Sequence, residues 1–183
     1  MTRKQSIFTV PNLLSVVRIL LIPVIVWLYC VREAYGLTAL VLVLSAVTDI
    51  ADGIIARKWN LISDLGKALD PIADKLTQIA TMWCLLSRFS YLWLPLALLM
   101  FKEIFTGAMS LYAVKKSGVV QGADWHGKLC TVLLYGTMGV HILWGSIPMF
   151  LSKLMMLVCM FVMCFSGLLY WYRNFKQIKG LGV

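Results

Sequence analysis

Four aspartates lie within 26 positions of a mostly apolar chain, and their spacing suits the binding of a cation. They are Asp49, Asp52, Asp70 and Asp74. Residues three and four positions apart share a helix face, so each pair forms one stripe. Carboxylates crowded at the edge of apolar segments need a counter-charge, and an all-oxygen donor set favours a hard divalent cation. The sequence therefore predicts a site for Mg²⁺ or Mn²⁺, expected to hold two ions that clamp a phosphate.

Small residues and one arginine accompany these aspartates. Gly53 and Ala56 continue the first stripe, Arg57 follows directly, and Gly66 stands four residues before Asp70. Glycine lets a ligand or a neighbouring helix approach closely, and arginine offers a fork of donors that suits phosphate. Each feature also has a structural explanation, helix packing for the glycines and a topology charge for the arginine. Their joint register with the aspartates favours a phosphate site.

The elements that position these residues are predicted to be membrane helices. The chain is 61% hydrophobic and 14% charged, with a mean hydropathy of +0.85, whereas a soluble domain is about half apolar and a quarter charged. Apolar runs of spanning length must form helices in lipid, where every backbone polar group needs an internal partner. We expect an all-α membrane protein, a six-helix bundle that forms one domain over residues 1–183. The expected spans are residues 11–31, 36–57, 66–88, 91–114, 126–144 and 151–172.

The distribution of basic residues predicts the orientation. Ten bases lie at the two ends of the chain and around the second and fourth loops: Arg3, Lys4, Arg57, Lys58, Lys67, Lys115, Lys116, Arg173, Lys176 and Lys179. Three lie on the other side: Arg32, Arg88 and Lys153. The bias places both termini and the aspartates at the cytoplasmic side of the cell membrane. Bases placed between apolar spans indicate topology and contact with anionic lipid, and they argue against a nucleic-acid partner.

The remaining polar and sulfur-containing residues are expected to serve packing. The five cysteines lie in apolar segments without CxxC spacing. His126 and His141 are expected to have structural roles. The short connection after Lys58 should make the second and third spans antiparallel neighbours, so that their aspartate stripes face each other.

The full pattern resembles a known family. The order Asp-x2-Asp-Gly-x2-Ala-Arg-x8-Gly-x3-Asp-x3-Asp, from Asp49 to Asp74, is similar to the signature of the CDP-alcohol phosphatidyltransferases at every fixed position. The segment Pro11-Asn12-Leu-Leu-Ser15-x2-Arg18 also resembles the opening helix of that family. The resemblance covers most of the chain, although only the motif is diagnostic.

The resemblance implies an activity and a set of roles. Members of the family transfer the phosphatidyl group of CDP-diacylglycerol to an alcohol and release CMP, and they are homodimers. By resemblance, Asp49, Asp52 and Asp70 would be metal ligands, and Asp74 a ligand that also serves as general base. Gly53, Ala56, Arg57 and Gly66 would line the site for CDP-diacylglycerol.

The alcohol acceptor is less clearly indicated. The pattern is most similar to bacterial phosphatidylglycerophosphate synthases, whose acceptor is glycerol 3-phosphate, and Lys102 and Lys128 are the candidate acceptor-binding bases. Those enzymes often carry additional bases where this chain has Ser110 and Cys130. The eukaryotic-type cardiolipin synthases of the same family, which use phosphatidylglycerol as acceptor, are similar in lacking both bases. Cardiolipin synthesis is therefore the alternative reading.

A membrane transporter is the alternative of another class, because intramembrane carboxylates also bind coupling ions. A transporter would place its charges near the bilayer midplane and would often show repeated halves. This chain gathers its aspartates at one face on consecutive helices and has no internal repeat. The pattern favours the enzyme.

Overall fold

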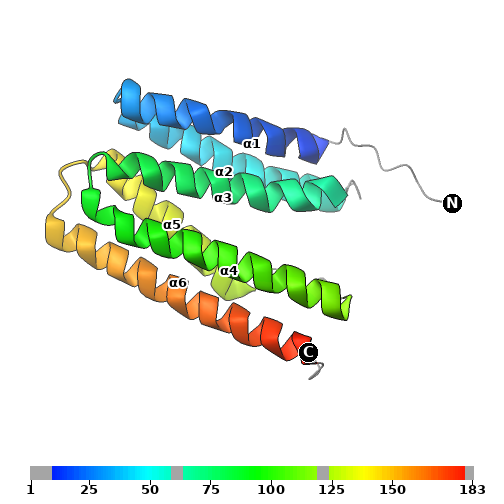
Figure 1. Ribbon diagram of the computed structural model, residues 1–183. Helices are drawn as coiled ribbons and strands as arrows, with labels where there is room; N and C mark the ends of the chain where they lie inside the picture. The colour runs from blue at the N-terminus through cyan, green and yellow to red at the C-terminus, as the bar shows by residue number, and fades with distance from the viewer. Residues whose placement is uncertain (1–9, 59–63, 119–123, 180–183) are drawn as a thin grey trace. The chain divides into compact units, whose positions relative to one another are not determined.

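The structure is a computed structural model that describes residues 10–58, 64–118 and 124–179, and these residues are helical with short turns and no strand (Figure 1). The helices, in chain order, are α1 (Val10–Val26), the π-helical turn η1 (Trp27–Val31), α2 (Tyr35–Lys58), α3 (Asp64–Leu86), the 3₁₀ turn η2 (Ser90–Leu92), α4 (Trp93–Ser117), α5 (Trp125–Leu143) and α6 (Met149–Ile178). The predicted all-α class is confirmed.

Three segments within the described part of the chain are long and apolar enough to cross a membrane. They are Leu13–Val31, Ser90–Ser117 and Met149–Ile178, and the apolar stretch Tyr35–Asp49 is shorter. Large apolar side chains such as Phe101, Leu111 and Phe161 point outward, as lipid-facing residues do. The chain is a membrane protein, and the six-span count stays a prediction.

The chain divides into two compact units, residues 1–87 and 88–183, and each is described by itself. In the first unit, α1 packs against both α2 and α3. Figure 1 shows α2 running opposite to α1 and α3, in the antiparallel sense predicted for the second and third spans. Within the described residues α2 and α3 make little direct contact, so the predicted direct pairing of these two helices is not seen, and α1 joins them. The expectation of one domain over residues 1–183 stays a prediction.

In the second unit α6 packs against both α4 and α5. Both α4 and α6 extend beyond the ends that the apolar pattern predicted. Helix α4 continues to Ser117 and ends at Gly118, whose φ of 70° is the left-handed conformation that glycine adopts readily. Helix α6 continues to Ile178, although its predicted span ended at residue 172. Asn174 Nδ2 donates to Ser110 Oγ at 3.0 Å and Gln177 Nε2 to Ser117 Oγ at 2.6 Å. These bonds hold the polar end of α6 against α4.

A buried polar chain joins α5, α6 and η2. His141 is fully buried, and its Nδ1 lies 2.7 Å from the carbonyl oxygen of Thr137. Because a carbonyl only accepts, Nδ1 carries the proton and Nε2 accepts from Ser152 Oγ at 2.7 Å. The Ser152 oxygen then accepts from the Tyr91 hydroxyl at 2.5 Å. The expected structural role of His141 is confirmed.

The Ser152→Ala variant should be less stable than the wild type by about 1–3 kcal/mol, because it leaves the buried His141 ring and the partly buried Tyr91 hydroxyl without this partner. Unfolding in detergent, followed by circular dichroism against temperature, measures the change. The exposed Ser146 provides the matched control, since Ser146→Ala should unfold like the wild type. Equal stability of the two variants would contradict this assignment.

Candidate active site

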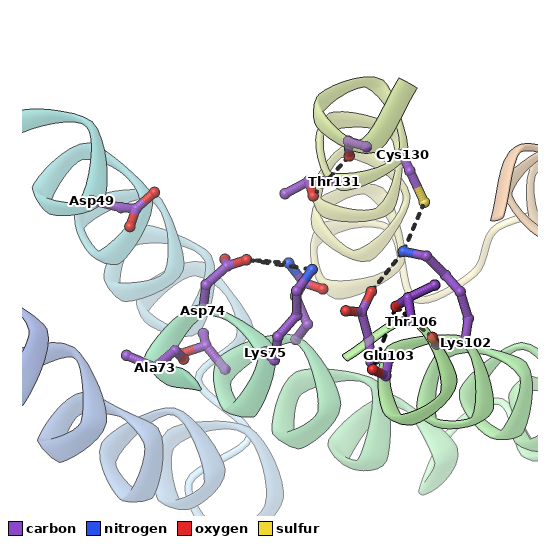
Figure 2. Close-up of polar contacts among 12 residues, drawn as sticks. Asp49, Ala73, Asp74, Lys75, Lys102, Glu103, Thr106, Cys130 and Thr131 are labelled. Atoms are coloured by element: carbon purple, nitrogen blue, oxygen red, sulfur yellow. Dashed lines mark hydrogen bonds and ion pairs between the residues drawn. The ribbon is translucent and has the colours of Figure 1, made fainter. Parts of the chain in front are cut away.

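Three helices of the first unit bring the described aspartates together. Asp49 lies near the end of α2, and Asp70 and Asp74 lie one turn apart in the first half of α3. The carboxylates of Asp70 and Asp74 exert electrostatic repulsion on that of Asp49. Figure 2 shows Asp49 and Asp74 on their two helices. The structure thus places three of the four predicted metal ligands on two helices of the first unit, and their role as ligands stays a prediction.

Helix α1 supplies two polar side chains that sequence reasoning had not placed in the site. Arg18 is buried, with 2% of its side chain exposed, and its Nη1 pairs with Asp49 Oδ1 while its Nη2 lies 3.4 Å from Asp70 Oδ1. Ser15 Oγ, also buried, donates to the same Asp70 oxygen. Their three-residue spacing on α1 puts both on one face, which is the signal that could have found them.

The carboxylates remain reachable on their other side. The side chains of Asp49 and Asp70 are 45% and 36% exposed, although Arg18 beneath them is almost completely buried. Asp74 is 21% exposed, and its Oδ2 accepts from Gln78 Nε2 at 2.9 Å and lies 3.8 Å from Lys75 Nζ (Figure 2). An ion or a phosphate can therefore approach the aspartates from the side opposite Arg18.

The donor set fits a divalent cation in chemistry. All the donors are carboxylate oxygens, as Mg²⁺ and Mn²⁺ prefer, and Arg18 and Lys75 supply two positive charges against three described carboxylates. No three metal-ligating side chains within the described part of the chain come close enough to enclose one ion. The side chain of Asp52, the fourth predicted ligand, lies outside the described residues.

For the residues predicted to bind CDP-diacylglycerol, the structure gives only the helix to which each belongs. Gly53, Ala56 and Arg57 belong to α2, and Gly66 belongs to the first turn of α3. Helical spacing keeps Asp52 and Ala56 on the Asp49 stripe. Their side chains are outside the part that the structure describes, so their roles stay predictions.

The two candidate acceptor-binding lysines belong to the second unit and have different surroundings. Lys102 of α4 is buried, and its Nζ lies 2.6 Å from Glu103 Oε1 and 4.0 Å from Cys130 Sγ (Figure 2). Lys128 is exposed in the first turn of α5. The acidic neighbour of Lys102 offsets its charge, which weakens it as a ligand for an anionic acceptor. Lys128 keeps an exposed ammonium group.

The start of α5 is held on α6 by close packing. A Cβ added at Gly127 would clash with the Tyr170 hydroxyl, which accepts from the backbone N–H of Asp124 at 3.3 Å. His126 Nδ1 lies 3.0 Å from Ser166 Oγ, and Asp124 Oδ2 lies 2.5 Å from Arg173 Nη1. The buried His126 therefore has its expected structural role. Gly127 provides the close approach that fixes the helix turn carrying Lys128.

The chain is similar to proteins of known activity. The sequence profile of the CDP-alcohol phosphatidyltransferase family matches residues 8–169. A CDP-diacylglycerol–glycerol-3-phosphate 3-phosphatidyltransferase of Rickettsia typhi is 32% identical, over 92% of this chain and 96% of the relative. An enzyme of the same name from Salmonella choleraesuis is 33% identical over 68% and 71%. A CMP-forming cardiolipin synthase of Streptomyces coelicolor is 43% identical, over 54% of this chain and 49% of the relative.

Mn²⁺ should raise the thermal unfolding midpoint of the wild type in detergent, because an ion that binds only the folded state stabilises it. Asp74→Asn should lose most of this increase, because it removes one of the clustered carboxylates. Glu33→Gln also replaces a carboxylate by an amide, at an exposed residue just before α2, and it should respond like the wild type. A full response of Asp74→Asn would show that Asp74 is not a ligand.

Proposed function

Because the chain belongs to the CDP-alcohol phosphatidyltransferase family, we propose that it transfers the phosphatidyl group of CDP-diacylglycerol to glycerol 3-phosphate. The products are phosphatidylglycerophosphate and CMP. The observation that carries this proposal is the aspartate cluster on α2 and α3, since its members are the residues of the family motif. The relatives that align over most of the chain are named for this reaction.

The proposed metal ligands are Asp49, Asp52, Asp70 and Asp74. Two bound Mg²⁺ or Mn²⁺ ions would supply charge neutralisation at the diphosphate and make CMP a better leaving group. Asp74 acts as general base and takes the proton of the acceptor hydroxyl as its oxygen attacks the β-phosphorus. The bond from that phosphorus to the CMP oxygen breaks, and CMP leaves with the electron pair. The bond from Gln78 to Asp74 Oδ2 holds the orientation of the base.

The donor substrate occupies the α2 and α3 face beside these aspartates. Gly53, Ala56 and Gly66 provide a surface without large side chains, and Arg57 donates to the diphosphate. Helical spacing supports this placement, because Ala56 falls on the stripe of Asp49 and Asp52.

Phosphatidylglycerol is the second candidate acceptor, with cardiolipin as product. Two observations favour it: the charge of Lys102 is offset by Glu103, and Ser110 is bonded to Asn174 where a base would otherwise offer charge. The relative from Streptomyces coelicolor is named a cardiolipin synthase. Glycerol 3-phosphate remains the first proposal, with Lys128 as its phosphate ligand and Lys102 in a weaker supporting role.

The proposed topology is six spans in the cell membrane, with both termini and the site in the cytoplasm, assembled as a homodimer. A helix rises 1.5 Å per residue, so even the 19 residues of α5 extend about 28 Å, close to the hydrocarbon thickness. The basic residues at the ends of α4 and α6 support the orientation. The family resemblance supports the dimer.

Purified wild-type protein should release CMP from CDP-diacylglycerol with Mg²⁺ and glycerol 3-phosphate, and EDTA should abolish the release. Asp74→Asn should lower kcat by about 10²–10⁴-fold, the usual contribution of a general base. Glu33→Gln is the matched control and should keep wild-type kcat. Release with phosphatidylglycerol alone would establish the second candidate, and no release with either acceptor would overturn the proposal.

Reporter fusions test the proposed orientation in a bacterial membrane. Green fluorescent protein fused after Val183 should fluoresce, because it folds in the cytoplasm. Alkaline phosphatase, which is active only outside the cytoplasm, should be active when fused after Trp144 and inactive after Val183. The reverse pattern would invert the proposed topology.

A further inference from the structure

One buried arginine joins the three helices of the first unit. Arg18 contributes Nη1 to Asp49 on α2 and Nη2 to Asp70 on α3, and Ser15, one turn earlier on α1, donates to Asp70. Helix α1 packs against both partner helices, so these polar contacts lie within its packing surface. No role for Ser15 or Arg18 follows from the aspartate motif itself.

The charges in this arrangement stabilise one another. A guanidinium with 2% of its side chain exposed has lost its hydration, which costs several kcal/mol unless anions compensate. Neighbouring carboxylates repel one another unless a cation lies among them. Arg18 supplies that cation from the buried side of the cluster, whereas the aspartates face outward on their other side.

The shape of the arginine side chain adds a geometric constraint. Its planar guanidinium presents two nitrogens in a fixed fork, and each nitrogen addresses a carboxylate from a different helix. The separation of Asp49 and Asp70 is thereby set by a rigid group. A lysine would keep the positive charge without setting this separation, because its ammonium is a single point charge on a flexible chain.

We propose that Arg18 is a positioning residue and the internal counter-ion of the aspartate cluster, and that it holds Asp49 and Asp70 in place before a divalent ion binds. The ion then takes over much of the compensation that Arg18 provides. This inference deepens the proposed function and rests on it, because it assumes that the aspartates bind metal. Ser15 assists by fixing the Asp70 oxygen that faces Arg18.

The proposal makes two opposite predictions for Arg18→Gln. Its unfolding midpoint in EDTA should fall by about 5–10 °C, because the carboxylates lose their counter-ion. Its affinity for Mn²⁺ should rise by about 10-fold, because the ion no longer meets a positive charge beside its ligands. Saturating Mn²⁺ should therefore reverse more than half of the decrease in the unfolding midpoint.

Arg18→Lys separates charge from geometry. The variant keeps the counter-ion, so its Mn²⁺ affinity should stay within about threefold of the wild type. It loses the fork, so its kcat for CMP release should fall by at least about 10-fold with little change in KM for CDP-diacylglycerol.

The experiment uses the full chain in detergent micelles, with Mn²⁺ binding followed by electron paramagnetic resonance and unfolding followed by circular dichroism. The matched control is Arg32→Gln, at an exposed arginine of the same unit that stacks on Trp27, and it should bind Mn²⁺ like the wild type. The inference would be overturned if the unfolding midpoint of Arg18→Gln fell by the same amount in Mn²⁺ as in EDTA, or if this variant bound Mn²⁺ more weakly than the wild type. Either result would leave the proposed function standing.

Two further outcomes are informative. Absence of Mn²⁺ binding by the wild type would overturn both the metal site of the proposed function and the inference that depends on it. If Arg18→Gln cannot be purified folded, Arg18→Lys decides alone: wild-type Mn²⁺ affinity with reduced kcat supports the inference, and Mn²⁺ affinity lowered more than 10-fold contradicts it.

Discussion

The repulsion between carboxylates at the edge of an apolar bundle is the constraint on which the first unit depends. The carboxylates of Asp70 and Asp74 repel that of Asp49, and charged groups at the edge of an apolar bundle are costly without compensation. The chain resolves this locally by placing Arg18 on the helix that packs against both α2 and α3. The packing of α1 on its two partner helices therefore also brings the charge of Arg18 to the carboxylates. The partly exposed aspartates can still bind a cation, because Arg18 offsets their charge from the buried side.

The second unit uses polar groups in another way. Its buried polar residues satisfy one another: His141 with Thr137 and Ser152 at one end of α5, and His126 with Ser166 near the other. Such bonds fix the rotation of α5 and α6, which apolar contacts alone specify weakly. Lys102 and Glu103 neutralise each other in the same manner. Polar side chains here maintain the packing of the helices, whereas in the first unit they create a surplus of negative charge.

The helical class could be predicted from the sequence, and so could the place of the aspartates on two consecutive helices, because both depend on local spacing. Arg18 and Ser15 were not predicted as site residues, because their three-residue spacing shows that they share a face of α1 but not which helix that face contacts. Sequence reasoning also ended α6 too early, since an apolar count stops at residue 172 while hydrogen bonds of Asn174 and Gln177 continue the helix. The adjacency of Lys102 and Glu103 already suggested an ion pair. The burial of Lys102 shows that its ammonium depends on Glu103 for charge compensation. Within the described residues α3 is not among the helices that are apolar enough to span, because Asp70, Asp74 and the buried polar residues beyond them lower its apolar content. Its predicted membrane span stays a prediction.

The length of α6 has a consequence for how the second unit meets the bilayer. Its 30 residues extend about 45 Å at 1.5 Å per residue, well beyond a hydrocarbon layer of about 30 Å. A helix that long must tilt or stand clear of the acyl chains at one end. The aromatic run at Tyr170–Tyr172 and the bases after it suit that end to the headgroup layer. Since α4 is hydrogen-bonded to this same end through Ser110 and Ser117, the two helices would share one depth in the bilayer.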